Sequence, residues 1–189
     1  MKFFLPILLI SFNCFSQHTE RFQELVKTVE RDSVVKDTIF FKNGIIEFIG
    51  EKSFYTSNDI IVETYSGESK IYYANGIIAR NDMQDRFGHW LWSKYYNRKG
   101  VLTKEWIITK IDSRAKSLED FFASRNHIDS EKTIKHYRNS KKTNELYAYK
   151  IEYLTSLNGI GGGKVEYQNE DRKVIRTKFL KEKKYKNVW

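Results

Sequence analysis

The chain has 189 residues, a formal net charge of +9 and a single cysteine. One cysteine excludes an internal disulfide, so the fold must rest on a hydrophobic core, and this length allows one good core or two small ones. Tyrosine (12), phenylalanine (13) and tryptophan (4) are abundant and there is one proline, a composition that favours β-strands.

The N-terminus has the pattern of a secretory signal peptide. A lysine follows the initiator methionine, and an apolar run covers Phe3–Ile10. This run is shorter than the roughly 20 residues that a membrane-spanning helix needs. Small residues at Cys14 and Ser16 predict cleavage before Gln17, which leaves 189 − 16 = 173 residues. The alternative is a buried N-terminal strand or helix.

Cys14 raises the question of lipidation. The residues before a lipidated cysteine are usually leucine, a small residue, then glycine or alanine, whereas this chain has Ser11-Phe12-Asn13. We therefore predict simple cleavage and export to the periplasm or the medium. We do not expect an exported protein to bind genomic DNA. No stretch of the sequence after the signal peptide is apolar enough to cross a membrane.

Three segments share a hairpin pattern: an aromatic pair, a turn ending in glycine, then an apolar or β-branched pair. They are Phe40–Glu47, Tyr72–Ala79 and, more loosely, Tyr95–Leu102. The Asn-Gly steps at Gly44 and Gly76 predict two-residue turns in which both residues have positive φ. Gly44 and Gly76 are 32 residues apart, and Gly76 and Gly100 are 24 apart; the second interval suits one hairpin per repeat.

The remaining elements are predicted from periodicity and capping. A leading helix is expected within Thr19–Val29, a helix capped by Ser117 begins near Leu118, and a second short helix is expected near Asp129–Ile134. Strands are expected at 145–153, 164–167 and 173–176, with a flexible glycine turn at 159–163. The fold class is mostly β with an α+β C-terminal part: antiparallel hairpin repeats at 17–112, then one or two helices and a closing antiparallel sheet at 113–189, after the signal peptide at 1–16.

One group of residues resembles the bacterial MORN-like repeat. Gly88-His89-Trp90, Tyr95-Tyr96, Gly100-Val101-Leu102 and Lys104-Glu105 match its pattern of G-x-W, an aromatic pair, a glycine turn and Lys-Glu. The chain is similar to exported proteins of Bacteroidota that carry this repeat. The resemblance implies stacked β-hairpins used for structure or interaction, and it carries no catalytic residues. Ser93-Lys94 lengthens the interval after the tryptophan, and Arg98-Lys99 replaces the usual asparagine before glycine.

Patterns of catalytic or metal chemistry are weak. The four histidines (His18, His89, His127 and His136) have no metal-ligand spacing, and surface histidines explain them better. The glycine run before Lys164 lacks the first glycine and the Ser/Thr of a phosphate-binding P-loop. A carboxylate-based hydrolase stays open as the least favoured alternative. We therefore expect no enzyme, no cofactor and no metal.

Two groups of residues are candidates for ligand binding. Trp90, Trp92 and Tyr96 share strand parity. We assign Trp90 to the core, and Trp92 and Tyr96 are candidates for a sugar- or peptide-binding face, with packing in the core as the alternative. The second group lies in residues 171–189, which carry 8 − 2 = +6 charges. Its candidates are Lys181, Lys183, Lys184 and Lys186. The alternative for these lysines is a solvated strand edge that blocks edge-to-edge pairing.

The sequence thus favours an exported, non-enzymatic structural or protein-interaction module. The runner-up is a binding module for anionic envelope polymers or lipid head groups that uses the basic C-terminus.

Overall fold

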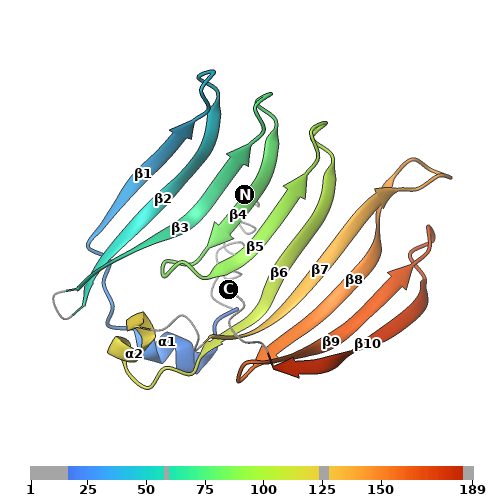
Figure 1. Cartoon of the computed structure of the whole chain (residues 1–189). Coiled ribbons are helices and arrows are strands. Elements are labelled where there is room, and N and C mark those ends of the chain that lie inside the picture. The colour runs from blue at the N-terminus through green and yellow to red at the C-terminus, as the bar shows by residue number, and fades with distance from the viewer. Residues whose placement is uncertain (1–16, 58–59, 124–127, 185–189) are drawn as a thin grey trace, which may run out of the picture.

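The structure is a computed structural model that describes residues 17–57, 60–123 and 128–184. Ten strands form one antiparallel sheet in which every strand pairs with its neighbours in sequence order (Figure 1). The prediction of a mostly β fold with a few helices is confirmed. The two predicted regions, 17–112 and 113–189, join in this one sheet because β6 pairs directly with β7.

Two short helices and ten strands make up the described chain. The helices are α1 (Glu20–Val26) and α2 (Leu118–Ala123). The strands are β1 (Ser33–Phe40), β2 (Ile46–Ser57), β3 (Ile60–Tyr72), β4 (Ile78–Gln84), β5 (Trp90–Tyr96), β6 (Leu102–Ser113), β7 (Ile128–Asn139), β8 (Leu146–Leu157), β9 (Ile160–Gln168) and β10 (Val174–Lys184).

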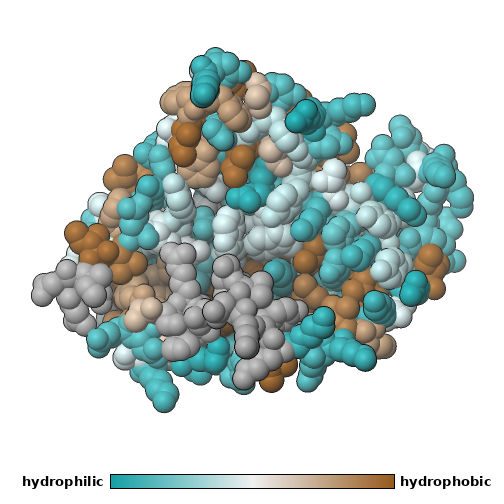
Figure 2. All heavy atoms as spheres, viewed as in Figure 1, coloured by the Kyte–Doolittle hydropathy of each residue, from teal (hydrophilic) through white to brown (hydrophobic). Residues whose placement is uncertain are grey.

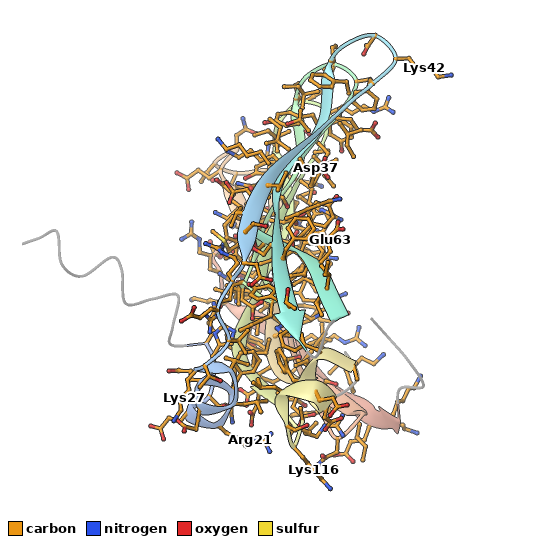
Figure 3. All side chains as sticks on the ribbon, turned by 90° about the vertical axis from the view of Figure 1, so that its left-hand side faces the viewer. Arg21, Lys27, Asp37, Lys42, Glu63 and Lys116 are labelled. Atoms are coloured by element: carbon orange, nitrogen blue, oxygen red, sulfur yellow. The ribbon has the colours of Figure 1, made fainter. Side chains whose placement is uncertain are left out.

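Both helices cover one end of the sheet and leave the rest as a single layer (Figures 1 and 3). Thr19 caps α1 by accepting the N–H of Phe22, and Ser117 caps α2 by accepting the N–H of Asp120, as its sequence position predicts. The main core cluster lies at this end. It consists of Phe22, Val26, Ile108, Ile111, Phe121 and Ile128.

The predicted hairpins exist, but their turns differ from the prediction. At the first, Phe41 N–H donates to the Ile45 carbonyl and Gly44 N–H to the Phe41 carbonyl, so the turn spans five residues. Only Gly44 has positive φ (+80°), and Asn43 does not. Asn43 instead accepts the Ile45 N–H with its side chain at 3.2 Å. Asparagine therefore acts here as a side-chain cap and not as a left-handed turn residue.

The same backbone bonding recurs at residues 73–77, 85–89, 97–101 and 169–173. Gly88 lies 12 residues from both Gly76 and Gly100. The 24-residue interval seen in the sequence therefore contains two strands, β4 and β5, joined by the intermediate turn at 85–89. The turn type predicted for Gly44 and Gly76, with two residues of positive φ, occurs instead at Asn158 (+53°) and Gly159 (+73°), where Leu157 pairs with Ile160. Gly161 to Gly163 belong to β9, so the prediction of a flexible turn over 159–163 was wrong beyond its first residue.

The second predicted helix, near Asp129–Ile134, was also wrong. This segment is part of β7, which hydrogen-bonds to β6 on one side and β8 on the other. Backbone pairing on both sides outweighs the weak helix-start signal of Asp129 and Glu131. The last strand is longer than predicted, because β10 continues to Lys184 and contains most of the basic C-terminal lysines.

Candidate functional site: a cation–aromatic cluster on one face of the sheet

Cross-strand register divides the side chains of the open sheet between two faces. Residues directly opposite each other in an antiparallel pair project from the same face, and successive residues alternate. From β4 to β10 one continuous row can be followed through the register. It contains Arg80, Tyr95, Lys104, His136, Lys150, Tyr167 and Arg176. We call the face that carries this row the Tyr95 face.

The row contains four permanent cations, a histidine and two tyrosines, with no carboxylate among its seven members. Neighbouring strands are about 4.8 Å apart, so the row runs about 29 Å across seven strands. Basic and aromatic side chains interleave along it. The Lys104 ammonium is 5.0 Å from the centre of the Tyr95 ring, and the Arg176 guanidinium is 5.6 Å from that of Tyr167.

The densest part of this face is a group that we call the cation–aromatic cluster. It consists of Arg80, Trp90, Tyr95, Lys104, Trp106 and Lys132. The indoles of Trp90 and Trp106 meet edge to face at 6.1 Å between ring centres, and the Trp106 indole N–H donates to the Tyr95 hydroxyl at 3.3 Å. Strands β4 to β7 each supply at least one member.

Two groups in the cluster, Lys132 and Tyr95, have pKa values below their ordinary ones. Partial burial, together with the positive charge of Lys104, lowers the pKa of Lys132, whose ammonium lies 5.3 Å from the Trp106 ring centre. Burial alone would raise the pKa of Tyr95, but hydrogen bonds from Trp106 and Ser93 and the charges of Arg80 and Lys104 lower it overall. The contribution of Lys104 to the first shift, and those of Arg80 and Lys104 to the second, reflect a local positive potential that an anion would relieve.

The carboxylates on this face neutralise only part of that charge. Asp82, fully buried, receives the Arg80 guanidinium at 2.7 Å and the Ser93 hydroxyl, and Glu152 pairs with Lys150 at 2.8 Å. Within residues 17–57, 60–123 and 128–184, neither Lys104 nor Lys132 has a carboxylate within ion-pair distance. Figure 2 shows one side of the molecule, where hydrophilic and intermediate side chains predominate and hydrophobic ones form separate patches.

A β-bulge separates Trp90 from the other two aromatic residues, Trp92 and Tyr96, with which it shares parity in the sequence. Gln84 pairs with Trp90 but Met83 pairs with Trp92, so Leu91 is the extra residue. Trp106 lies opposite Ser93 and therefore projects from the same face as Ser93, opposite to that of Trp92. Because Trp90 contacts Trp106, Trp90 and Trp92 project from opposite faces. Trp90 is half-buried on the Tyr95 face, outside the main core to which the sequence assigned it.

Trp92 and Tyr96 do share a face, the one opposite to Tyr95, and both are half-buried. Lys94 lies between them in sequence, with its ammonium 5.6 Å from the centre of the Trp92 ring. The Tyr96 carbonyl accepts the Tyr73 hydroxyl at 2.8 Å. The pair of predicted ligand residues is therefore on one surface, but away from the cation–aromatic cluster.

The predicted basic site is distributed along the outer strand. Lys181 and Lys183 are exposed on β10, and Lys184 is its last residue. Lys186 lies outside the described residues. Of the histidines, His136 hydrogen-bonds through Nε2 to the Glu152 carboxylate at 2.7 Å, and His127 falls outside the described residues. No group of three potential metal ligands is found in the described part of the chain.

Sequence reasoning missed a second polar cluster, which we call the His–Asp clasp. One oxygen of Asp85 bonds both His18 Nε2 at 2.8 Å and His89 Nδ1 at 2.9 Å, and the other accepts the N–H groups of Phe87 and His89. Burial alone would raise the Asp85 pKa, but the two histidines outweigh it and hold that pKa well below its ordinary value.

The clasp fastens the segment before α1 to the β4–β5 turn. His18 also bridges to Ile111 of β6, whose N–H donates to the Gln17 carbonyl at 2.7 Å. Beside it lies a mainly apolar groove of about 740 Å³, with Phe22, Met83 and Leu91 in its lining. The signal for the clasp in the sequence is Asp85-x-x-Gly88-His89, a turn with a polar residue at each end.

Comparisons with known proteins give no match: no protein-family description, no curated protein and no solved structure is similar to this chain. The MORN-like resemblance therefore stays a prediction. Among the described helices, none has both the length and the apolar character needed to cross a bilayer.

Proposed function

We propose that this protein is an exported, non-enzymatic binding module that holds an acidic polysaccharide of the cell envelope against the Tyr95 face. The observation that carries the proposal is the half-buried Lys132, whose ammonium packs on Trp106 close enough to Lys104 to be affected by its charge. Among the described residues no carboxylate lies within 4 Å of it, and Glu152 offsets its charge only from farther away. Partly buried charges are normally paired, so an unpaired cation next to a second cation favours an anionic ligand.

The neighbouring aromatic rings favour a sugar as the carrier of that anion. Tyr95, Trp90 and Trp106 are half-buried and can cover the apolar face of a sugar ring, while lysines receive its carboxylate or sulfate. The row of seven residues on β4 to β10 suits an extended polysaccharide chain that lies across the strands. The basic lysines of β10, favoured by the sequence, would then extend the positive end of the row.

The binding proposal predicts that Lys104→Gln/Lys132→Gln weakens affinity for alginate or heparin about tenfold or more, because two charge-assisted contacts are lost. Binding should also depend less steeply on salt than in the unmodified protein. Calorimetry or affinity chromatography at low and physiological ionic strength would measure this, with neutral dextran as the uncharged probe.

The matched control is Lys181→Gln/Lys183→Gln, which removes the same charge from exposed positions on β10. We expect this control to lose less affinity than the cluster variant. Equal losses in the two variants would indicate attraction by net charge alone, and a larger loss in the β10 variant would favour the basic C-terminal site. Unchanged binding in both would remove the proposal.

The export part of the proposal predicts a mature N-terminus at Gln17, free or cyclised, with no lipid. A chain cut there begins at a residue whose carbonyl is bonded to β6, so cleavage leaves α1 and the clasp in place. Intact-mass spectrometry of protein from the native host would measure it. A mass that includes Met1, or a diacylglyceryl group on Cys14, would contradict this prediction.

A further inference from the structure

The two edges of the open sheet are protected to very different degrees. Edge strands expose unpaired backbone groups, and proteins usually block them with charged side chains, bulges or covering loops. β10 carries five basic residues, Arg176, Lys178, Lys181, Lys183 and Lys184, and a register shift between Leu180 and Lys183. These features protect β10 against pairing with a further strand.

β1 has little such protection. Its sequence, SVVKDTIF, contains one lysine and one aspartate, and seven of its eight side chains are exposed. Its single register shift, between Ile39 and Phe40, lies at the end next to the β1–β2 turn, whereas β10 has two. The exposed apolar residues include Val35 (51% exposed), Ile39 (46%) and Phe40 (57%). In the view onto this edge, β1 is uncovered along its length and the helices lie below it (Figure 3).

The charge of the chain is also unevenly distributed between the edges. Residues 33–72, which form β1 to β3, carry four lysines and six acids, a net charge of 4 − 6 = −2. Residues 160–184, which form β9 and β10, carry eight basic residues and four acids, a net charge of 8 − 4 = +4. Of the two symmetric edge pairings, β1 with β1 therefore brings smaller like charges together than β10 with β10. The β1–β10 pairing, which opposite charge alone would favour, is blocked by the basic side chains and register shifts of β10.

We propose that two copies of the chain pair through β1, antiparallel, about a two-fold axis normal to the sheet, and form one continuous sheet of twenty strands. An axis normal to the sheet keeps each face on its own side, so opposing residues must have the same strand parity. Centring the pairing on Asp37 satisfies this condition and places Val35 opposite Ile39 of the second copy.

This register pairs the exposed apolar residues Val35 and Ile39 across the axis and keeps the two Lys36 side chains apart. Centring one residue earlier would place Lys36 opposite Lys36 of the second copy. In the favoured register the two Asp37 side chains meet, but each is already held by Tyr65 at 2.7 Å and lies 3.6 Å from Lys52. The negative charge of Asp37 is therefore partly compensated within each copy, because Lys52 also pairs with Glu63 at 2.7 Å.

The dimer has a consequence for ligand binding, although the inference itself does not depend on the proposed function. Because the axis is normal to the sheet, the Tyr95 faces of both copies lie on the same side. A long polymer can then contact two cation–aromatic clusters at once, which raises apparent affinity through effective concentration.

Sedimentation velocity or light scattering tests the dimer. We expect a reversible dimer over a range of about 1 to 100 µM, and Val35→Lys should weaken self-association at least about tenfold by placing a charge in the pairing edge. The matched control, Ile175→Lys, alters an exposed apolar residue at the other edge (66% exposed, against 51% for Val35) and should leave the dimer intact.

A cysteine pair keeps the test independent of folding effects. In a Cys14→Ser background, Val35→Cys/Ile39→Cys should form a covalent dimer on mild oxidation, because the Cα atoms of directly opposing residues lie about 4.5–5.5 Å apart, within the range that a disulfide spans. Val35→Cys alone should not. A monomer at every concentration, a dimer unaffected by Val35→Lys, or a dimer lost only with Ile175→Lys would each overturn the proposal.

Discussion

Gly163→Ala is expected to destabilise the fold by about 3 kcal/mol, or to lower the melting temperature by about 10 °C. Gly163 has φ +148°, a conformation that side chains rarely adopt, and an added Cβ would lie 2.0 Å from the Tyr153 carbonyl oxygen. That oxygen belongs to the backbone of β8, so the clash can be relieved only by separating β8 from β9. Thermal and denaturant unfolding would measure the loss.

The neighbouring Gly162→Ala is the matched control. Its φ is not in the positive range, and the added Cβ would lie 3.5 Å from the Glu182 side chain, an ordinary contact. We expect a change within about 0.5 kcal/mol, of either sign. Equal melting temperatures for Gly163→Ala and Gly162→Ala would contradict the close approach of β8 and β9.

Asp85→Ala is expected to cost about 3–5 kcal/mol, because the change leaves two histidines and two backbone N–H groups without their shared carboxylate. The Asp85 side chain is buried and receives four hydrogen bonds. We also expect the segment before α1 to detach, so amide hydrogen exchange should increase at Thr19 and Ile111. Unfolding curves and hydrogen exchange together measure both effects.

The β5–β6 turn supplies a control for the turn alone. Asn97 accepts the N–H groups of Lys99 and Val101 at 2.9 and 3.1 Å, as Asp85 does for its own turn, but its side chain makes no bond to a histidine within the described part of the chain. Asn97→Ala should therefore cost only about 1 kcal/mol. A loss as large as that of Asp85→Ala would assign the effect to turn capping and not to the clasp.

The charge of Asp85 also predicts a pH dependence. Its pKa is lower in the folded than in the unfolded protein, so ionisation stabilises the fold above the unfolded pKa of about 3.9, and this stabilisation is lost as pH falls below that value. Asp85→Asn removes the charge while keeping the side-chain shape. The difference in stability between the unmodified protein and the Asp85→Asn variant should narrow below about pH 4. Melting curves recorded from about pH 3 to about pH 7, a range that includes the unfolded pKa, would measure it.

The sequence alone determined the local structure wherever a short-range pattern was decisive. The apolar face of Thr19–Val29 predicted α1, the Ser117 cap predicted α2, and the glycines at 44, 76 and 100 marked hairpin turns. These features depend on residues within a few positions of each other, so one sequence suffices to find them. The mostly antiparallel fold class followed from the same patterns.

Only the tertiary structure decided which residues share a surface. A single extra residue, Leu91, reverses the parity between Trp90 and Trp92, and such a bulge leaves no clear mark in the sequence. Likewise, β7 is a strand because β6 and β8 lie on both sides of it, although its first residues favour a helix start.

The candidate site depends on long-range register in the same way. Lys104 and Lys132 are 28 positions apart, and nothing local marks them as neighbours. The Asp85-x-x-Gly88-His89 turn marks one half of the His–Asp clasp, but His18 joins Asp85 from 67 positions away. The sequence determined that this protein is rich in basic and aromatic residues. The pairing of strands decided that Lys132 lies beside Lys104 over Trp106, because backbone hydrogen bonds between distant segments fix which side chains meet.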